Sequence, residues 1–199
     1  MSSLVLASAS PRRRQILEWL GLDFEVVTPD VEELTEGRGP EGLVLENARL
    51  KALAGLELAD DGEGLVLGAD TDVFLGEEPL GKPAHRGEAE ERLRALSGRS
   101  HLVLSGVCLL PKDGSEGAHR ERSGVAESRV TFRDLDDATI ETYLASGEWR
   151  DRAGGYAIQG LGSFLIEKVE GDFSNVVGMP LRLLLALAPE FGRNPNPNV

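Results

Sequence analysis

The 199-residue chain is poor in cysteine and in long apolar runs. Its one cysteine, Cys108, excludes both an intrachain disulfide and a metal site built from several cysteines. No apolar run approaches the roughly 20 residues of a membrane-spanning helix, and the apolar start at residues 2–6 is too short for a signal peptide. We therefore expect no membrane partner and a cytoplasmic location.

Positive charge is also scarce, because 21 Lys and Arg stand against 34 Asp and Glu, a formal net charge of −13. Proteins that bind nucleic acids in general carry the opposite excess, so we expect no nucleic-acid partner. An anionic ligand would need a local cluster of basic residues. Hydrophobic residues make up 41% of the chain, which is enough for a core in one domain or two small lobes.

Short apolar runs alternate with segments of helical periodicity, and this predicts a mixed α/β protein with two lobes around a cleft. The expected strands are 4–7, 24–27, 65–69, 101–110, 125–132 and 164–169, and the expected helices are 12–20, 40–58, 87–96, 138–145 and 181–187. Ser10 and Pro11 should begin the first helix as N-cap and first residue. In the helix at 40–58, Leu43, Leu50 and Leu53 take apolar positions.

Basic residues gather where the first strand leads into the first helix, in the segment Ser-Ala-Ser-Pro-Arg-Arg-Arg at 8–14. A helix N-terminus favours an anion, so three cations there are unfavourable unless an anion binds. Arginine also suits bidentate contacts with phosphate. The segment therefore favours phosphate binding; the alternative is a basic turn neutralised by nearby carboxylates.

Asp70 follows the predicted strand 65–69, at the edge where ligands gather in α/β sheets. A carboxylate there can bind a metal or activate water, or it can simply cap a turn through Thr71. Three other charged residues would each be taken alone for surface residues: Glu33, Lys51 and Lys82. The histidines, His85, His101 and His119, show no metal-ligand spacing. Glycines at 154–160 and 171–181 indicate close approach to a ligand or to another strand.

Taken together and in order, these segments resemble the Maf family, which was named for septum formation inhibition. The matching motifs are LASASPRR (6–13), ARLKA (48–52), GADT (68–71), GKP (81–83), LSG (96–98), VTF (130–132), YAIQG (156–160) and NVVGMPL (175–181). The similarity runs from about residue 4 to residue 187. No single motif is decisive, but the ordered set is specific.

The resemblance implies a nucleoside triphosphate pyrophosphatase that cleaves between the α and β phosphates and releases a nucleoside monophosphate and pyrophosphate. It also implies a divalent cation (Mg, Mn or Co), a homodimer, and an elongated, twisted mixed sheet flanked by helices, related to the inosine triphosphate pyrophosphatases. A single Maf-like domain would span 1–191. Residues 192–199 contain no core-forming residues, and we expect them to form a flexible tail.

The resemblance also assigns roles to residues. Asp70 would accept the proton of the attacking water, and Glu33 would join Asp70 around the metal. The triphosphate would be bound by Ser8, Arg12, Arg13, Lys51 and Lys82. Two residues depart from the family pattern: Asp72 stands where an apolar residue is usual, and Arg152 replaces a lysine. Strand alternation points Asp72 away from Thr71, so we expect it to lie outside the cleft.

Three residues bear on the substrate: Arg12, Thr71 and Gln159 match the family members that hydrolyse dTTP and UTP. Members acting on 7-methyl-GTP tend to carry Trp, Gln and Glu at these places. A glutamine amide can donate to one edge group of uracil or thymine and accept from another. The alternatives are a pyrophosphatase for modified or purine nucleotides such as 7-methyl-GTP, and a non-catalytic nucleotide-binding regulator of cell division.

Overall fold

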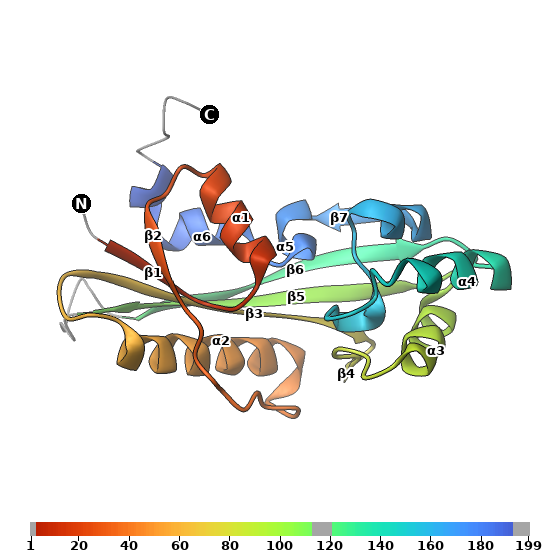
Figure 1. Ribbon diagram of the computed structural model, residues 1–199, viewed down its shortest axis with the longest axis horizontal. Coiled ribbons are helices and arrows are strands. Elements are labelled where there is room, and N and C mark those ends of the chain that lie inside the picture. Colours follow the sequence, from red (N-terminus) through yellow and green to blue (C-terminus); the bar gives the residue numbers. More distant parts are fainter. Residues whose placement is uncertain (1–2, 113–120, 193–199) are drawn as a thin grey trace.

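A computed structural model describes residues 3–112 and 121–192, and a twisted mixed sheet runs along the length of the elongated molecule (Figure 1). Its strands are β1 (Ser3–Ala7), β2 (Phe24–Val27), β3 (Gly64–Leu75), β4 (Glu78–Pro79), β5 (Ser100–Pro111), β6 (Arg122–Phe132) and β7 (Ile166–Gly171). The sheet order is β2-β1-β3-β5-β6-β7, with β4 paired to β3. Only β1 pairs in parallel, with β2 and β3. The predicted α/β class is confirmed.

The helices cover both faces of this sheet (Figure 1). They are α1 (Pro11–Trp19), α2 (Gly39–Leu58), α3 (Arg86–Leu96), α4 (Asp137–Ser146), α5 (Phe173–Val177) and α6 (Leu181–Leu187), with 3-10 helices η1 (Ala153–Gly155), η2 (Gly160–Leu165) and η3 (Pro189–Gly192). At one end of the sheet, α1 and α6 lie on one face and α2 on the other; α3 and α4 lie at the opposite end. Within the described ranges, no helix has the length and apolar character needed to cross a membrane.

Two hydrophobic clusters form the cores of the two lobes. The first joins β1, α1, β3 and α6 and includes Leu6, Leu17, Leu67, Met179 and Leu184. The second joins α3, α4 and the far ends of β5 and β6 and includes Leu93, Val103, Phe132, Ile140 and Trp149. Along β3 the first cluster ends at Ala69 and the second begins at Val73, so residues 70–72 lie between the two clusters.

Helix α2 packs closely against β3 and β5 because two glycines face it. A Cβ atom at Gly68 would lie 2.2 Å from the carbonyl oxygen of Ala48, and one at Gly106 would lie 2.2 Å from that of Val44. The inward stripe of α2 consists of Leu43, Val44, Asn47, Ala48, Ala52 and Gly55. Leu53, which the sequence placed among the apolar positions, is 42% exposed. The close approach brings the polar residues of α2 directly onto the sheet.

Some predicted boundaries are wrong. The strand expected at 65–69 continues to Leu75, because β5 supplies an antiparallel partner at residues 65–74 and β4 pairs with Leu75. The strand expected from Phe164 begins at Ile166, since Phe164 belongs to η2. Ser10 occupies the N-cap position of α1 without a side-chain capping bond. In the predicted tail, Gly192 ends η3, and 193–199 lie outside the described residues.

Candidate active site

A cavity of about 1220 Å³ lies between the two lobes. Its lining includes all nine site residues that the sequence predicted: Ser8, Arg12, Arg13, Glu33, Lys51, Asp70, Thr71, Lys82 and Gln159. They come from the end of β1, the start of α1, the β2–α2 connection, α2, β3 and the segments after β4 and α4. The fold thus brings together side chains that lie up to 151 positions apart in the sequence.

The cavity opens beside the part of β3 that lies between its pairing with β1 and its pairing with β4. Strand β1 ends at Ala7, opposite Gly68, whereas β4 pairs with β3 only at Phe74 and Leu75. Asp70 therefore lies in the middle of a long strand, opposite Gly106 of β5, and not at a strand end. The turn-capping alternative for Asp70 is wrong for the same reason. In this stretch, neighbouring side chains of β3 point to opposite faces and border the cavity from both sides.

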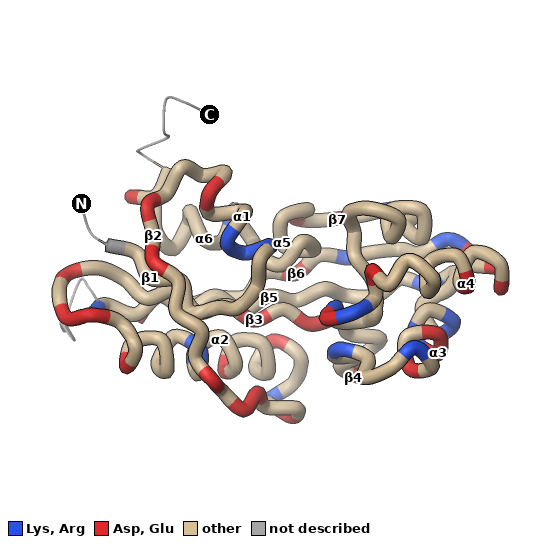
Figure 2. The backbone as a smooth tube through the Cα atoms, viewed as in Figure 1, with Lys and Arg blue, Asp and Glu red and all other residues tan. Residues whose placement is uncertain are grey.

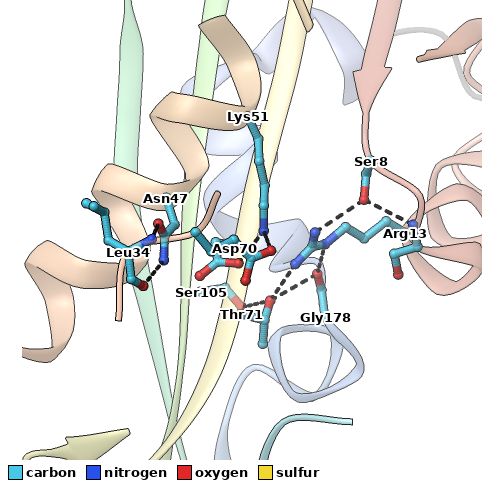
Figure 3. A network of polar contacts seen from close by, with 11 residues as sticks. Ser8, Arg13, Leu34, Asn47, Lys51, Asp70, Thr71, Ser105 and Gly178 are labelled. Carbon is cyan, nitrogen blue, oxygen red and sulfur yellow. Dashed lines mark hydrogen bonds and ion pairs between the residues drawn. The ribbon is translucent and has the colours of Figure 1, made fainter. Parts of the chain in front are cut away.

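Arg13 is buried at the start of α1, and its guanidinium faces neutral acceptors. Nε donates to the carbonyl oxygen of Gly178 at 2.9 Å, Nη1 to Ser8 Oγ at 3.3 Å and Nη2 to Thr71 Oγ1 at 3.2 Å (Figure 3). Burial lowers the pKa of Arg13, and the charges of Asp70 and Glu33 oppose that shift. A buried cation bonded to neutral groups retains charge for an incoming anion.

The other two arginines of the basic cluster separate. Arg12 is half-buried and lines the cavity, whereas Arg14 points outward and pairs with Glu18 at 2.9 Å. Figure 2 shows the start of α1 as a continuous basic stretch in a chain with many acidic segments. The local excess of positive charge expected from the sequence is therefore present, but only two of the three arginines of this cluster, Arg12 and Arg13, border the cavity.

Lys51 joins two of the carboxylates that line the cavity, Glu33 and Asp70. Its Nζ lies 2.6 Å from Asp70 Oδ1 (Figure 3). It also lies 2.6 Å from Glu33 Oε1, so the two carboxylate oxygens are at most twice that distance apart. Within the described ranges, no group of three or more His, Cys, Asp or Glu could hold a metal ion. Two carboxylates are nevertheless the donor set of Mg²⁺ sites that complete their coordination with water and substrate phosphate. The residues present fit such an ion.

Asn47 holds the segment that carries Glu33. Residues 28–38 form neither helix nor strand. The Asn47 side chain lies four residues before Lys51 on α2, and it binds both backbone groups of Leu34. Its Oδ1 accepts from the Leu34 N–H at 2.8 Å, and its Nδ2 donates to the Leu34 carbonyl at 3.0 Å (Figure 3). The sequence reasoning missed Asn47, although a polar residue on the buried stripe of a helix could have revealed it.

Asp72 lines the cavity and does not lie outside it as expected. Its Oδ1 accepts from the backbone N–H of Val73 at 2.7 Å and of Gly81 at 3.1 Å. Burial raises the pKa of Asp72 to about 6, and the nearby charge of Asp70 adds to the shift, whereas the two hydrogen bonds and Arg92 oppose it. Asp72 thus anchors the residue that precedes Lys82.

The profile of the family described as Maf-like protein matches residues 3–191. The chain belongs to the Maf family. It is 46% identical over 184 residues to a dTTP/UTP pyrophosphatase of Deinococcus radiodurans, covering 92% of this chain and 90% of that protein. It is 42% identical over 193 residues to a dTTP/UTP pyrophosphatase of Dictyoglomus thermophilum, covering 95% and 96%. A Thermococcus gammatolerans protein of the same name is 45% identical over 184 residues (92% and 94%).

Two solved structures are similar to this Maf chain. One is a nucleoside-triphosphatase, dITP/XTP pyrophosphatase, of Mycobacterium abscessus, with a TM-score of 0.48 and 15% identity over 94% of this chain and 98% of that one. The other is the Staphylococcus aureus Ham1 protein, with a TM-score of 0.43 and 17% identity over 65% and 72%.

The second family departure, Arg152, also borders the cavity of this Maf protein. Burial lowers the pKa of its guanidinium. Its buried Nε has no hydrogen-bond partner among the described residues. Arg152 therefore brings a positive charge, and an Nε–H donor without a partner among the described residues, to the border of the cavity.

Proposed function

We propose that this Maf protein hydrolyses dTTP and UTP between the α and β phosphates. The observation that carries the proposal is one cavity in which Arg13, buried and bonded to neutral acceptors, lies near the Glu33–Lys51–Asp70 group. Such a site suits a highly charged triphosphate beside a hydrolytic carboxylate. The relatives named dTTP/UTP pyrophosphatase support the same reaction.

The triphosphate would bind along the basic side of the cavity. Arg13 offers a planar guanidinium whose geometry matches phosphate oxygens, and Ser8 and Thr71 hold it in place. Arg12, Lys51 and Lys82 would add positive charge around the leaving pyrophosphate, where negative charge increases as the bond breaks. Because Arg13 and Lys51 are already positioned by their contacts before substrate arrives, these two groups need little reorganisation during the reaction.

Glu33 and Asp70 would hold a divalent cation such as Mg²⁺, Mn²⁺ or Co²⁺ together with the substrate. When bound, the cation neutralises phosphate charge and polarises the phosphoryl oxygens. Lys51 already places the two carboxylates near each other, so the protein part of the site is formed in advance.

Asp70 would act as the general base. Lys51 binds its Oδ1 at 2.6 Å and so orients the carboxylate, while Oδ2 can accept a proton from water. The water oxygen bonds to the α phosphorus, and the bond from that phosphorus to the bridging oxygen breaks. Pyrophosphate leaves with the bridging oxygen and its electron pair, and the proton of the water passes to Asp70.

The base of the nucleotide would be read at the other end of the cavity by Gln159, which is exposed. Its amide can both donate to and accept from the edge of uracil or thymine. Thr71 acts at the phosphate end, because its hydroxyl contacts Arg13 at 3.2 Å and Ser105 at 2.8 Å. The homodimer and the cytoplasmic location stay predictions.

The test is pyrophosphate release from dTTP, UTP, CTP, GTP and 7-methyl-GTP with Mg, Mn or Co. We expect turnover of dTTP and UTP by the wild type and by Asp61→Asn, a control in an exposed loop, and none by Asp70→Asn. All three should give the same circular dichroism spectrum. Wild-type turnover by Asp70→Asn would refute the mechanism, and activity only on purine nucleotides would refute the substrate. Tight nucleotide binding without turnover would favour a regulatory protein.

A further inference from the structure

The segment that carries Gln159 is anchored on its N-terminal side by buried side chains. Tyr156 is 5% exposed, and its hydroxyl lies 2.8 Å from Nε2 of His101. The next residue, Ala157, donates its backbone N–H to the hydroxyl of Tyr143 at 3.0 Å. Gln159 follows two residues later and is exposed. The chain therefore enters this segment in a fixed direction.

On the C-terminal side, one carboxylate holds the segment. Glu148 Oε1 accepts from the backbone N–H of Leu161, and Oε2 from that of Gly162, both at 3.1 Å. These N–H groups belong to the first turn of η2, where a helix leaves its donors without intrahelical partners. An ionised carboxylate is a strong acceptor for such groups. Glu148 thus binds the backbone on the other side of Gln159.

The residue between Gln159 and this contact must be glycine. Gly160 has a φ of +73°, and a Cβ atom there would lie 2.6 Å from Glu148 Oε1. Any other side chain would be strained in that conformation and would also push the carboxylate away. The tight turn directly after Gln159 and the Glu148 contact therefore depend on each other.

Glu148 is itself rigidly placed at the end of α4. The helix ends in Gly147, whose φ of +73° is a left-handed C-cap. The N–H of Glu148 donates to Ser146 Oγ at 3.1 Å. The next residue, Trp149, is 5% exposed and donates from Nε1 to the carbonyl of Leu144 at 3.1 Å. These contacts of the α4 end hold the carboxylate of Glu148 in place, and Glu148 itself also lines the cavity.

We propose that Glu148 is a positioning residue that fixes Gln159 and so sets the preference for uracil and thymine over cytosine. The proposal rests on the base-reading role of Gln159 proposed above. An amide discriminates between bases only when its position relative to the base is fixed, because its donor and acceptor ends exchange on rotation. At the edge where the two bases differ, cytosine has a donor where uracil has an acceptor, and an acceptor where uracil has a donor. If the segment were loosened, the Gln159 amide would rotate and bind cytosine as well.

The test is the ratio of kcat/KM for dTTP to kcat/KM for CTP in Glu148→Ala, Glu148→Gln, Gln159→Ala and the double variant Glu148→Ala/Gln159→Ala. We expect Glu148→Ala to lower the ratio on the order of tenfold, and Glu148→Gln, which keeps one acceptor, to give an intermediate value. The double variant should have the ratio of Gln159→Ala alone, since Glu148 acts through Gln159. The control is Glu141→Ala on the same helix, whose ion pair with Arg86 is exposed; it should keep the wild-type ratio.

A second measurement, amide hydrogen exchange, does not depend on activity. In Glu148→Gln and Glu148→Ala, the amides of Leu161 and Gly162 should exchange faster than in the wild type. Unchanged exchange of these amides would overturn the inference. An unchanged ratio in Glu148→Ala, together with a lowered ratio in Gln159→Ala, would also overturn it. Either result would leave the proposed function standing. An unchanged ratio in Gln159→Ala would overturn the role of Gln159 and the inference with it.

Discussion

Replacing Asn47 by alanine tests how the site holds Glu33. The substitution removes both hydrogen bonds to Leu34, at 2.8 Å and 3.0 Å, and leaves no polar group in their place. Asn47 is only 3% exposed, so solvent reaches the vacated space poorly. Glu33 precedes Leu34 directly, and its contact with Lys51 at 2.6 Å depends on the path of that backbone. Stability and activity should therefore fall together.

The magnitude follows from the two bonds. A net contribution of about 1 kcal/mol for each predicts a loss of about 2 kcal/mol in the free energy of unfolding. Asn47→Asp keeps the acceptor for the Leu34 N–H, but it turns a carboxylate oxygen toward the Leu34 carbonyl and buries a charge, so a loss at least as large as that of Asn47→Ala is expected. Glu46→Ala, on the exposed face of the same helix, should change stability by less than about 0.5 kcal/mol.

The assay is urea denaturation at pH 7, read as the midpoint at constant m-value, together with kcat/KM for dTTP. In Asn47→Ala we expect a lower midpoint and a kcat/KM reduced on the order of tenfold, as a misplaced carboxylate would produce. Lower stability with unchanged kcat/KM would show that Asn47 supports the fold without positioning Glu33. Stability within about 0.5 kcal/mol of the wild type would refute the reasoning altogether.

Two further predictions concern stability. Burial lowers the pKa of His101 from 6.5 to about 4, so the unfolded chain alone binds the proton in this range and stability is lost as the pH falls. The stability advantage of the wild type over His101→Gln should shrink by about 3 kcal/mol between pH 7 and pH 4 in urea denaturation, and a constant difference would contradict this. Gly68→Ala should destabilise by about 3 kcal/mol, because its Cβ would meet backbone atoms of Ala48 and Ala52 at 2.2 and 2.5 Å. Gly76→Ala, with a φ of +69° and open space, should lose only about 1 kcal/mol, and equal midpoints of the two variants would refute the packing argument.

The elements that the sequence predicted well are those determined by residues close together in the sequence. In α3, Ala89, Leu93 and Leu96 are buried as their helical spacing predicts, because a surface helix needs only one apolar stripe. The pairing of β5 with β6 is likewise confirmed, since two apolar strands close in sequence form a hairpin readily. The end of β3 could not be predicted in this way. Its second half contains Asp70 and Asp72, and it stays in the sheet because β5 continues beside it.

The site also contains residues that the sequence predicted and residues that it did not. The nine predicted residues all line the cavity, but they were found through ordered motifs and not through periodicity. Asn47 and Glu148 were missed because each binds backbone groups 13 or 14 positions away, and helical or strand periodicity does not predict contacts at that separation. For Asn47 a signal existed, a polar side chain among Leu43, Val44 and Ala48 on the buried stripe of α2. For Glu148, which lies after the end of α4, we find no comparable signal.

The position of the cavity follows from a difference in strand length. β1 has five residues and β3 has twelve, and the two strands begin in register at Ser3 and Gly64. The shorter strand therefore stops beside Gly68, and the chain turns into α1, from which Arg13 reaches Thr71 on the exposed edge of β3. Asp70 is the second residue beyond that point. Within two residues of the apolar pair at Ala7 and Gly68, the edge of β3 therefore carries Asp70, the proposed base, beside the proposed phosphate-binding start of α1, and lengthening β1 would close the site.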